Sequence, residues 1–525
     1  MSGFSSPVVL IALALIVSYG IYTLSQVGRR EPALPPGPPT VPILGNLHQI
    51  PLTGFHKKTL EWAQKYGPIY SVKLGPGTLI VLTSKKAIHD LLDKRSAIYS
   101  DRPKDYIGDI ITGGEKLEHM HYNDLWRAQR KIATQSVAPR VLDTKVAPLQ
   151  EAENVLLLQD LLHDPASFSS HIQRATVSVA NTLVWGHRAS SSSTFWGRTP
   201  WLSLEGFSEC FELGANPPLE QFPFLKLIPE RFAPWVRRAR VPNAAMRRTW
   251  GEARRRVEER RARGDRRMGA LFDQIAEGEL RADVPLTESQ VNHFLGTMVE
   301  GGAETSSSAM LTSVLFLALH REVQIKAQRE LDAVCGPERI PTWGDFATLP
   351  YINCIVKEAM RIRPVGPLGV PHCATRDDWY EGMFIPKGSI ALLPAWTVHR
   401  LESNGYKNPD AYDPDRWIGQ TRTAAELAGI ADYENRDEEH HYSYGAGRRV
   451  CPGMHMAERT MWRMTAKILW AFDIIPVDVD PDNYDEGIIH RPNPYKVEFR
   501  PRSEAHVKTI EREVGPALEF LKQFE

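Results

Sequence analysis

Cysteine is scarce in this chain of 525 residues. The cysteines that occur are Cys210, Cys335, Cys354, Cys373 and Cys451, and no two of them form a CxxC motif. An odd number of widely spaced cysteines argues against a disulfide framework and against a cysteine-rich zinc site. We therefore expect most of the chain to lie in a reducing compartment.

An excess of charge of either sign is also absent. The chain has 63 basic and 63 acidic residues, so no overall attraction to nucleic acid is expected. Residues 237–267 do contain thirteen arginines, but Glu252, Glu258 and Glu259 are interleaved among them. No aromatic stacking platform accompanies this run, which favours a solvated helix face over a nucleic-acid partner.

Long hydrophobic runs are lacking, with one exception at the N-terminus. Residues 7–27 carry no charge and are numerous enough to span a bilayer as a helix. Arg29 and Arg30 follow, and the positive-inside rule then places the rest of the chain in the cytosol. A cleaved signal peptide is the alternative, but the basic n-region and a small-x-small cleavage site are missing.

The organisation that we expect has three parts. Residues 1–28 form a single-pass membrane anchor, and residues 29–46, with six prolines between Pro32 and Pro42, form a stiff, extended hinge. Residues 47–525 show no repeat and no second hydrophobic span, so they are expected to form one catalytic domain.

Helical periodicity dominates that domain. Apolar residues at three- and four-residue spacing predict helices over 55–66, 84–94, 124–138, 142–162, 169–183, 243–263, 287–320, 322–334, 350–362 and 455–472. Short β-rich runs occur at 69–83, 382–394 and 496–501. The expected fold class is mainly α with small β-sheets (α+β), not a doubly wound parallel sheet.

Cys451 stands in the stretch YGAGRRVCPG, residues 444–453. Glycines in this stretch allow tight turns, and the periodic sequence after Pro452 places Cys451 just before a helix N-terminus, which favours a thiolate. A buried structural cysteine is the commoner fate of a single cysteine. The spacing of the glycines and arginines favours an iron-bound thiolate, which needs no second cysteine.

The pattern aromatic-x-x-Gly-x-Arg-x-Cys-x-Gly resembles the haem-thiolate signature of the cytochrome P-450 family. It is matched by Tyr444, Gly447, Arg449, Cys451 and Gly453. The resemblance implies that Cys451 is the axial ligand of haem b iron, and that Arg449, Tyr444 and Gly447 bind the cofactor. The family usually has phenylalanine where Tyr444 stands, and the added hydroxyl needs a hydrogen-bond partner if it is buried.

The stretch GGAET, residues 301–305, resembles the oxygen-activating motif of the same family. Gly301 and Thr305 share one helix face because they are four residues apart. The resemblance implies that the Thr305 hydroxyl binds the distal oxygen and that Glu304 supplies a proton. A helix kink with a capping threonine is the alternative reading of the stretch.

Two more motifs occur in the family's order. Glu358 and Arg361 lie three residues apart on an apolar segment, and the resemblance joins them to Arg416 as a structural triad. Trp126 and Arg130 share a helix face, and the resemblance makes both haem-propionate ligands, with His372 as a third ligand. A pair on a helix surface is the alternative for Trp126 and Arg130.

The substrate pocket is predicted only regionally. Its expected residues are mostly apolar, which favours a hydrophobic small molecule; they are Met298, Val299, Gly301, Ala303, Val365, Leu368 and Ile488. The aromatic and basic segment 222–238 suits a loop that dips into a membrane interface. The pair His440-His441 is expected in a surface loop that leads to the cysteine, and not in a metal site.

The resemblance implies a monooxygenase on the cytosolic side of the endoplasmic reticulum membrane. Because the chain has no flavin or nicotinamide domain, electrons are expected from NADPH through a separate reductase, with cytochrome b5 as a further candidate donor. The donor is expected to dock near Arg448 and Lys467. Segments 356–372 and 441–460 look fungal, which favours secondary-metabolite biosynthesis.

Two other functions stay open. One is an isomerase or dehydratase of the same fold, although the intact GGAET stretch favours dioxygen chemistry. The other is a non-enzymatic, membrane-tethered binder of haem or lipid.

Overall fold

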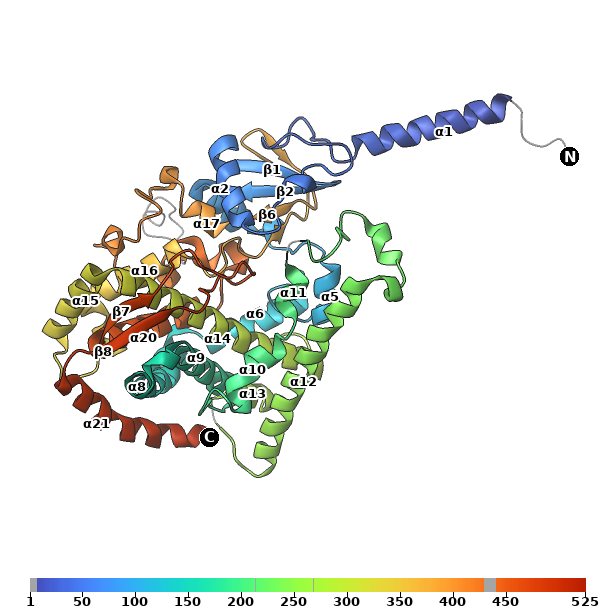
Figure 1. The fold of residues 1–525 in the computed structure, drawn as a ribbon. Coiled ribbons are helices and arrows are strands. Elements are labelled where there is room, and N and C mark those ends of the chain that lie inside the picture. Colours follow the sequence, from blue (N-terminus) through green and yellow to red (C-terminus); the bar gives the residue numbers. More distant parts are fainter. Residues whose placement is uncertain (1–6, 213, 268, 429–440) are drawn as a thin grey trace.

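The computed structural model describes residues 7–212, 214–267, 269–428 and 441–525 (Figure 1). Helices make up most of the body, and the strands gather in small sheets, so the expected fold class is confirmed. The helices are α1 (Pro7–Gln26), α2 (Phe55–Tyr66), α3 (Lys85–Ile88), α4 (Ser96–Tyr99), α5 (Tyr106–Thr112), α6 (Asp124–Ser136), α7 (Pro139–Val141), α8 (Ala147–His163), α9 (Phe168–Trp185), α10 (Phe195–Ser203), α11 (Phe207–Phe211), α12 (Pro234–Ala262), α13 (Leu271–Ala276), α14 (Glu288–Leu319), α15 (Arg321–Val334), α16 (Pro350–Ile362), α17 (Ala395–Val398), α18 (Ala424–Ala428), α20 (Met454–Ala471) and α21 (Glu504–Leu521).

The strands form three separate sheets. A four-stranded sheet has the order β1-β2-β6-β3, in which only β2 and β6 are parallel. The pairs β4-β5 and β7-β8 are antiparallel. The strands are β1 (Ile69–Leu74), β2 (Gly77–Leu82), β3 (His372–Cys373), β4 (Asp378–Tyr380), β5 (Met383–Ile385), β6 (Ile390–Leu392), β7 (Phe472–Asp478) and β8 (Lys496–Pro501).

Helix α1 projects away from the body (Figure 1). Residues 9–26 are apolar and long enough to cross a membrane, and none of them is buried against the rest of the protein. The proline-rich segment that follows lies on β1. Arg30 donates to the carbonyls of Pro35 and Ser71, at 2.9 and 3.0 Å, and Asn46 donates to Pro39 O at 2.9 Å. Through these contacts, part of the segment predicted as a stiff hinge, residues 29–46, packs against β1.

Helix α14 crosses the interior and positions the site. Thr287 and Gln290 form a capping box at its start, which satisfies backbone N–H groups that the helix itself leaves unpaired. The helix packs against α9, α12, α16 and α20. One hydrophobic core lies along its C-terminal half with α8, α9, α16 and α20, and a second lies along its N-terminal half with α5, α6 and α12.

Most of the predicted helices agree with the structure within a few residues, whereas several short helices, among them α5, α10, α11 and α13, were not predicted. Two segments predicted as α-helix contain a π-helical stretch. It is His89–Lys94 in the segment 84–94 and Leu142–Val146 in the segment 142–162. Helix α12 starts at Pro234 and continues through Pro242, although a proline is most compatible with a first turn. Helix α21 was not predicted, although its buried residues recur at three- or four-residue spacing: His506, Ile510, Val514, Ala517 and Leu521.

Glu358 and Arg361 form a fully buried ion pair on α16. Arg361 donates to both carboxylate oxygens of Glu358, at 2.8 and 2.7 Å. Arg416 Nε donates to the same carboxylate at 3.2 Å, as do Trp417 Nε1 at 2.9 Å and the backbone N–H of Asp413 at 2.8 Å. The structure therefore brings the three residues of the expected triad together.

This cluster is connected to the segment that carries Cys451. The backbone oxygen of Arg361 accepts from His399 Nδ1 at 3.1 Å. His399 Nε2 then accepts from the N–H of Tyr442 at 3.1 Å, and Ser443 Oγ donates to Met360 O at 2.8 Å. Through these buried or partly buried bonds, α16 fixes the backbone immediately before the cysteine loop.

We expect Glu358→Ala to destabilise the protein strongly. It leaves Arg361 buried without its carboxylate, which costs about 3–5 kcal/mol. Arg416→Ala is the matched control, because it leaves the Glu358–Arg361 pair intact and should cost about 1–2 kcal/mol. Urea unfolding of both variants measures the difference, and equal losses would contradict this account of the cluster.

Candidate active site

Cys451 lies in a tight loop between two 3-10 turns and helix α20. The turns are Tyr442–Tyr444 and Gly447–Arg449, and α20 begins at Met454. The N–H of Cys451 donates to Tyr444 O at 2.9 Å. Gly447 has a φ of 65°, and a Cβ there would collide with the carbonyl oxygen of Leu92. The close contact with Leu92 therefore requires a glycine at position 447, which is one of the residues predicted to bind the cofactor.

The Cys451 thiol is not in a disulfide, and its surroundings act on its pKa in opposite directions. Burial raises the pKa of the thiol, whereas the N–H of Gly453 and the charge of Arg130 act in the opposite direction. Among the described residues, no group of three His, Cys, Asp or Glu side chains could hold a metal ion. A metal bound to Cys451 would therefore need a cofactor to supply its remaining ligands.

Arg102, Arg130 and Arg449 form a cluster of cations near Cys451. Burial, reinforced by the neighbouring arginines, lowers the pKa of Arg102 to about 10 and that of Arg449 to about 9. Within the described part of the chain, none of the three pairs with a carboxylate, and their hydrogen bonds go to backbone carbonyls. The acceptors are Glu118, Val370 and Pro371 for Arg102, Val450 for Arg130, and Ser100, Leu117 and Met120 for Arg449.

Buried cations without a carboxylate partner require an anion. The two propionates of haem b meet this requirement, and Cys451 provides a thiolate beside them. The residues present therefore fit haem b. Arg102 was not predicted from the sequence, because it stands in an irregular segment and belongs to no recognisable motif.

Trp126 and Arg130 share one face of α6, as predicted. Asn123 Oδ1 accepts from the N–H of Trp126 at 2.8 Å and caps the helix. The guanidinium of Arg449 lies 4.1 Å from the centre of the Trp126 ring, and that of Arg130 lies 6.0 Å away. The structure therefore groups these three predicted propionate ligands.

His372 is placed less favourably for that role. Its Nδ1 lies 2.8 Å from the carbonyl oxygen of Tyr99, so Nδ1 carries the proton. Burial lowers the pKa of His372 to about 3. In this neutral form Nε2 can only accept a hydrogen bond. His372 can therefore donate to an ionised propionate only when the imidazole is protonated.

Gly301 and Thr305 open one face of α14. Gly301 is exposed in the middle of the helix, and a Cβ there would meet no atom within 4 Å. Thr305 Oγ1 donates to Gly301 O at 2.6 Å, so its lone pairs remain free to accept. Burial raises the pKa of Glu304. The helix thus offers an acid and a hydroxyl at an open internal surface.

The residues predicted for the pocket divide into two groups. Gly301 is exposed and Met298 is half-buried, so both can border this space. Val299 and Ala303 are fully buried in the core with α12, because residues two apart lie on opposite sides of a helix. Of the other three, Val365 is buried in a core cluster, Leu368 packs against the β1-β2 core, and Ile488 is exposed in the loop before β8.

Two further expectations need correction. Lys467 is not on a docking surface, because its side chain is 2% exposed and its ammonium pairs with Glu151. His441 is buried instead of lying in a surface loop, and His440 lies outside the described residues. Arg448 is exposed, as expected, and donates to Tyr122 Oη at 2.7 Å.

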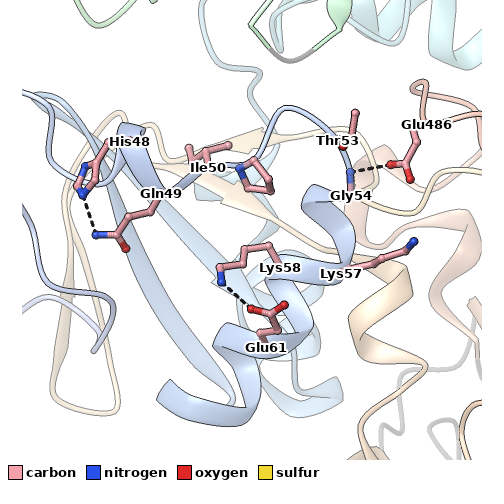
Figure 2. A pocket seen from close by; sticks show the side chains of 10 residues that line it. His48, Gln49, Ile50, Thr53, Gly54, Lys57, Lys58, Glu61 and Glu486 are labelled. Carbon is pink, nitrogen blue, oxygen red and sulfur yellow. Dashed lines mark hydrogen bonds and ion pairs between the residues drawn. The ribbon is translucent and has the colours of Figure 1, made fainter.

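A separate pocket of about 520 Å³ lies at the surface beside α2 (Figure 2). Glu486 accepts from the N–H of Gly54 at 2.7 Å at its rim, and Lys58 pairs with Glu61. Its lining consists of His48, Gln49, Ile50, Pro51, Thr53, Gly54, Lys57, Lys58, Glu61 and Glu486. None of the predicted site residues lines it, so this pocket is distinct from the site at Cys451.

The fold and the thiol site define a haem-thiolate oxygenase. Residues 35–499 match the family model for cytochrome P-450, and the chain belongs to that family. It is 41% identical to the cytochrome P-450 monooxygenase yanC of Aspergillus niger, over 94% of this chain and 95% of the relative. It is 40% identical to macC of Penicillium terrestre, over 96% of both chains, and 36% identical to patH of Aspergillus clavatus, over 98% of both. Both relatives are also named cytochrome P-450 monooxygenases, and the chain is an enzyme of this class.

Tyr444 gives a prediction about its extra hydroxyl. The hydroxyl is buried and has no hydrogen-bond partner among the described residues. Burial raises the pKa of Tyr444, as do the nearby Glu458 and Cys451. We expect Tyr444→Phe to raise the free energy of unfolding by about 1 kcal/mol, because it removes an unsatisfied buried group. It should also shift the haem reduction potential modestly. Chemical denaturation and redox titration test both effects, and a variant unchanged in both would contradict this prediction.

Proposed function

We propose that this monooxygenase inserts one oxygen atom from O2 into a hydrophobic small molecule, by hydroxylation, epoxidation or successive oxidations. The observation that carries the proposal is the free thiol of Cys451 beside buried arginines that have no carboxylate partner. When bound, haem b would supply the activation of dioxygen, and the Cys451 thiolate would hold its iron and increase the electron density there. The second oxygen atom leaves as water, and the electrons come from NADPH through a separate reductase.

The residues of the chain have separate tasks in this proposal. Arg102, Arg130 and Arg449 hold the propionates and fix the orientation of the cofactor. Thr305 Oγ1 accepts a hydrogen bond from a donor on the open side of α14, because its own hydroxyl proton is donated to Gly301 O. Glu304 keeps its proton to a higher pH than an exposed glutamate does, because burial raises its pKa, and it is the source in this proposal of a proton for the oxygen atom that leaves as water.

The proposed setting is the cytosolic face of the endoplasmic reticulum membrane, with α1 as a single-pass anchor. Exposed apolar side chains in the segment before α12 support a membrane-facing surface. Leu227 is 83% exposed, and Phe224 and Phe232 are also exposed. Phe222 packs over Gly75, so this segment lies near the proline-rich N-terminal part of the body. The fungal relatives support a role in secondary-metabolite biosynthesis.

We expect Cys451→His to abolish the long-wavelength Soret band of the reduced carbon monoxide complex, because that band requires thiolate ligation. Haem should still bind, since the arginine cluster is unchanged. Cys335→Ala is the matched control: this cysteine is partly buried at the end of α15 and should leave the band intact. A Cys451→His variant that keeps the band would overturn the proposed ligand.

Thr305→Ala should lower severalfold the amount of oxidised product formed per NADPH consumed, because the proton route loses its hydroxyl. Thr305→Ser retains an Oγ that can donate to Gly301 O and should keep most of the coupling. Product and NADPH are measured in parallel with a purified reductase. Turnover without NADPH would instead support the isomerase or dehydratase alternative.

A further inference from the structure

The π-helical stretch His89–Lys94 packs against the cysteine loop, residues 442–453. Such stretches are rare and occur frequently at functional sites. Two consecutive residues of this one contact Gly447. The N–H of Gly447 donates to Asp93 Oδ1 at 2.7 Å, and a Cβ on Gly447 would collide with the carbonyl oxygen of Leu92. The stretch therefore holds the backbone of the loop through one hydrogen bond and one close contact.

The carboxylate of Asp93 is itself held by a second side chain. His89 Nδ1 lies 3.0 Å from Asp93 Oδ2, whereas Asp93 Oδ1 faces the N–H of Gly447. The side chain of His89 is 5% exposed and that of Asp93 is 22% exposed, so protein surrounds most of both groups. A hydrogen bond from an N–H group to a carboxylate is stronger than one to a neutral acceptor. One carboxylate thus joins the imidazole to the cysteine loop.

Gly447 begins the turn that leads to Cys451. The turn ends at Arg449, one of the arginines that face the cofactor, and the N–H of Val450 donates to Gly447 O at 3.1 Å. Cys451 follows directly. A displacement of Gly447 would therefore move both Arg449 and the sulfur.

The cysteine loop has space in which it can shift. A cavity of about 40 Å³ lies beside it, and Asp93 lines this cavity together with Tyr442, Gly445 and Val450. The cavity is large enough for a water molecule. Packing is therefore incomplete on this side of the loop, and the hydrogen bond to Asp93 limits the movement of the backbone.

We propose that Asp93 is a positioning residue for the thiolate of Cys451, and that His89 orients the Asp93 carboxylate for this task. The inference rests on the proposed function, because it treats the sulfur as the ligand of haem iron. Asp93 touches neither the sulfur nor the cofactor site. It acts through the backbone of Gly447 and fixes where the loop presents the sulfur.

The task of Asp93 is geometric. Burial raises the pKa of the Cys451 thiol, and among the nearby charges Arg130 lowers that pKa and Glu458 raises it. Asp93 supplies an acceptor oxygen, which an asparagine amide at the same position would also supply. The acceptor and the charge can therefore be separated by mutation.

The test uses the full-length, haem-loaded enzyme in detergent and measures the reduced carbon monoxide spectrum and the haem reduction potential. Asp93→Ala should raise about tenfold the ratio of complexes without the thiolate band to complexes with it, because a hydrogen bond to a charged acceptor has this magnitude. It should also raise the potential, since a displaced thiolate donates less electron density to the iron. Asp93→Asn should stay close to the wild type in both measurements, because its amide oxygen still accepts from Gly447.

Asp90→Ala is the matched control in the same stretch. The Asp90 side chain is 19% exposed, and it pairs with Lys86 at 2.9 Å and with Lys94 at 3.3 Å instead of contacting the loop. This variant should leave the band and the potential unchanged, even where urea unfolding shows a loss of stability. His89→Ala keeps the acceptor but frees the carboxylate, so it should give a smaller change in the same direction as Asp93→Ala. It keeps the test decisive if Asp93→Ala fails to incorporate haem.

The outcomes separate this inference from the proposed function. If the wild-type enzyme lacks the thiolate band, the proposed function fails. If the band is present but Asp93→Ala and His89→Ala both match Asp90→Ala, the inference alone is wrong. It is also wrong if Asp93→Asn loses the band as fully as Asp93→Ala, because the hydrogen bond to Gly447 would then not be the cause.

Discussion

The concentration of positive charge beside a single thiol is the constraint on which this structure depends. A buried guanidinium is stable only if its donors are occupied and its charge is balanced. Around Cys451 the donors of Arg102, Arg130 and Arg449 reach backbone carbonyls, and none of the three forms an ion pair with a described carboxylate. Asp101 and Glu118 only partly offset the charge of Arg102, and Asp101 partly offsets that of Arg449. These arginines therefore need an anionic partner. The same partner must stabilise the thiolate of Cys451, which within the protein is favoured only by the N–H of Gly453 and the charge of Arg130. A flat cofactor with two carboxylates and a central metal satisfies both conditions at once.

The rigidity of the cysteine loop follows from contacts outside it. Glu358 fixes Arg361, whose backbone oxygen holds His399, and His399 in turn holds the N–H of Tyr442. Gly447 adds a close backbone contact with Leu92 on the other side of the loop. The sulfur is thus positioned by two distant parts of the chain. A loop of three glycines would otherwise have considerable conformational freedom, which binding of a cofactor would have to remove.

The sequence predicted the parts of the site that depend on local spacing. The glycines and arginines around Cys451, the four-residue spacing of Gly301 and Thr305, and the pair Glu358–Arg361 are all readable from short segments. Arg102 was not predicted, because it stands in an irregular segment and acquires meaning only when the folded chain brings it beside Arg130 and Arg449. The sequence does not show which side of α14 is buried. Val299 and Ala303 are buried with α12, whereas Gly301 is exposed, because the packing of α14 on α12 decides this.

The turn of α14 beside the site carries two acids with different environments. Glu300 is occupied by Ser203, Trp250 and Lys116, which come from three different elements. Glu304, one turn later, receives no side-chain hydrogen bond from the described residues, and burial raises its pKa. Because the two are four residues apart, they project from the same side of the helix. Environment alone can therefore divide their tasks, with Glu300 as the group that joins the elements and Glu304 as the group able to release a proton.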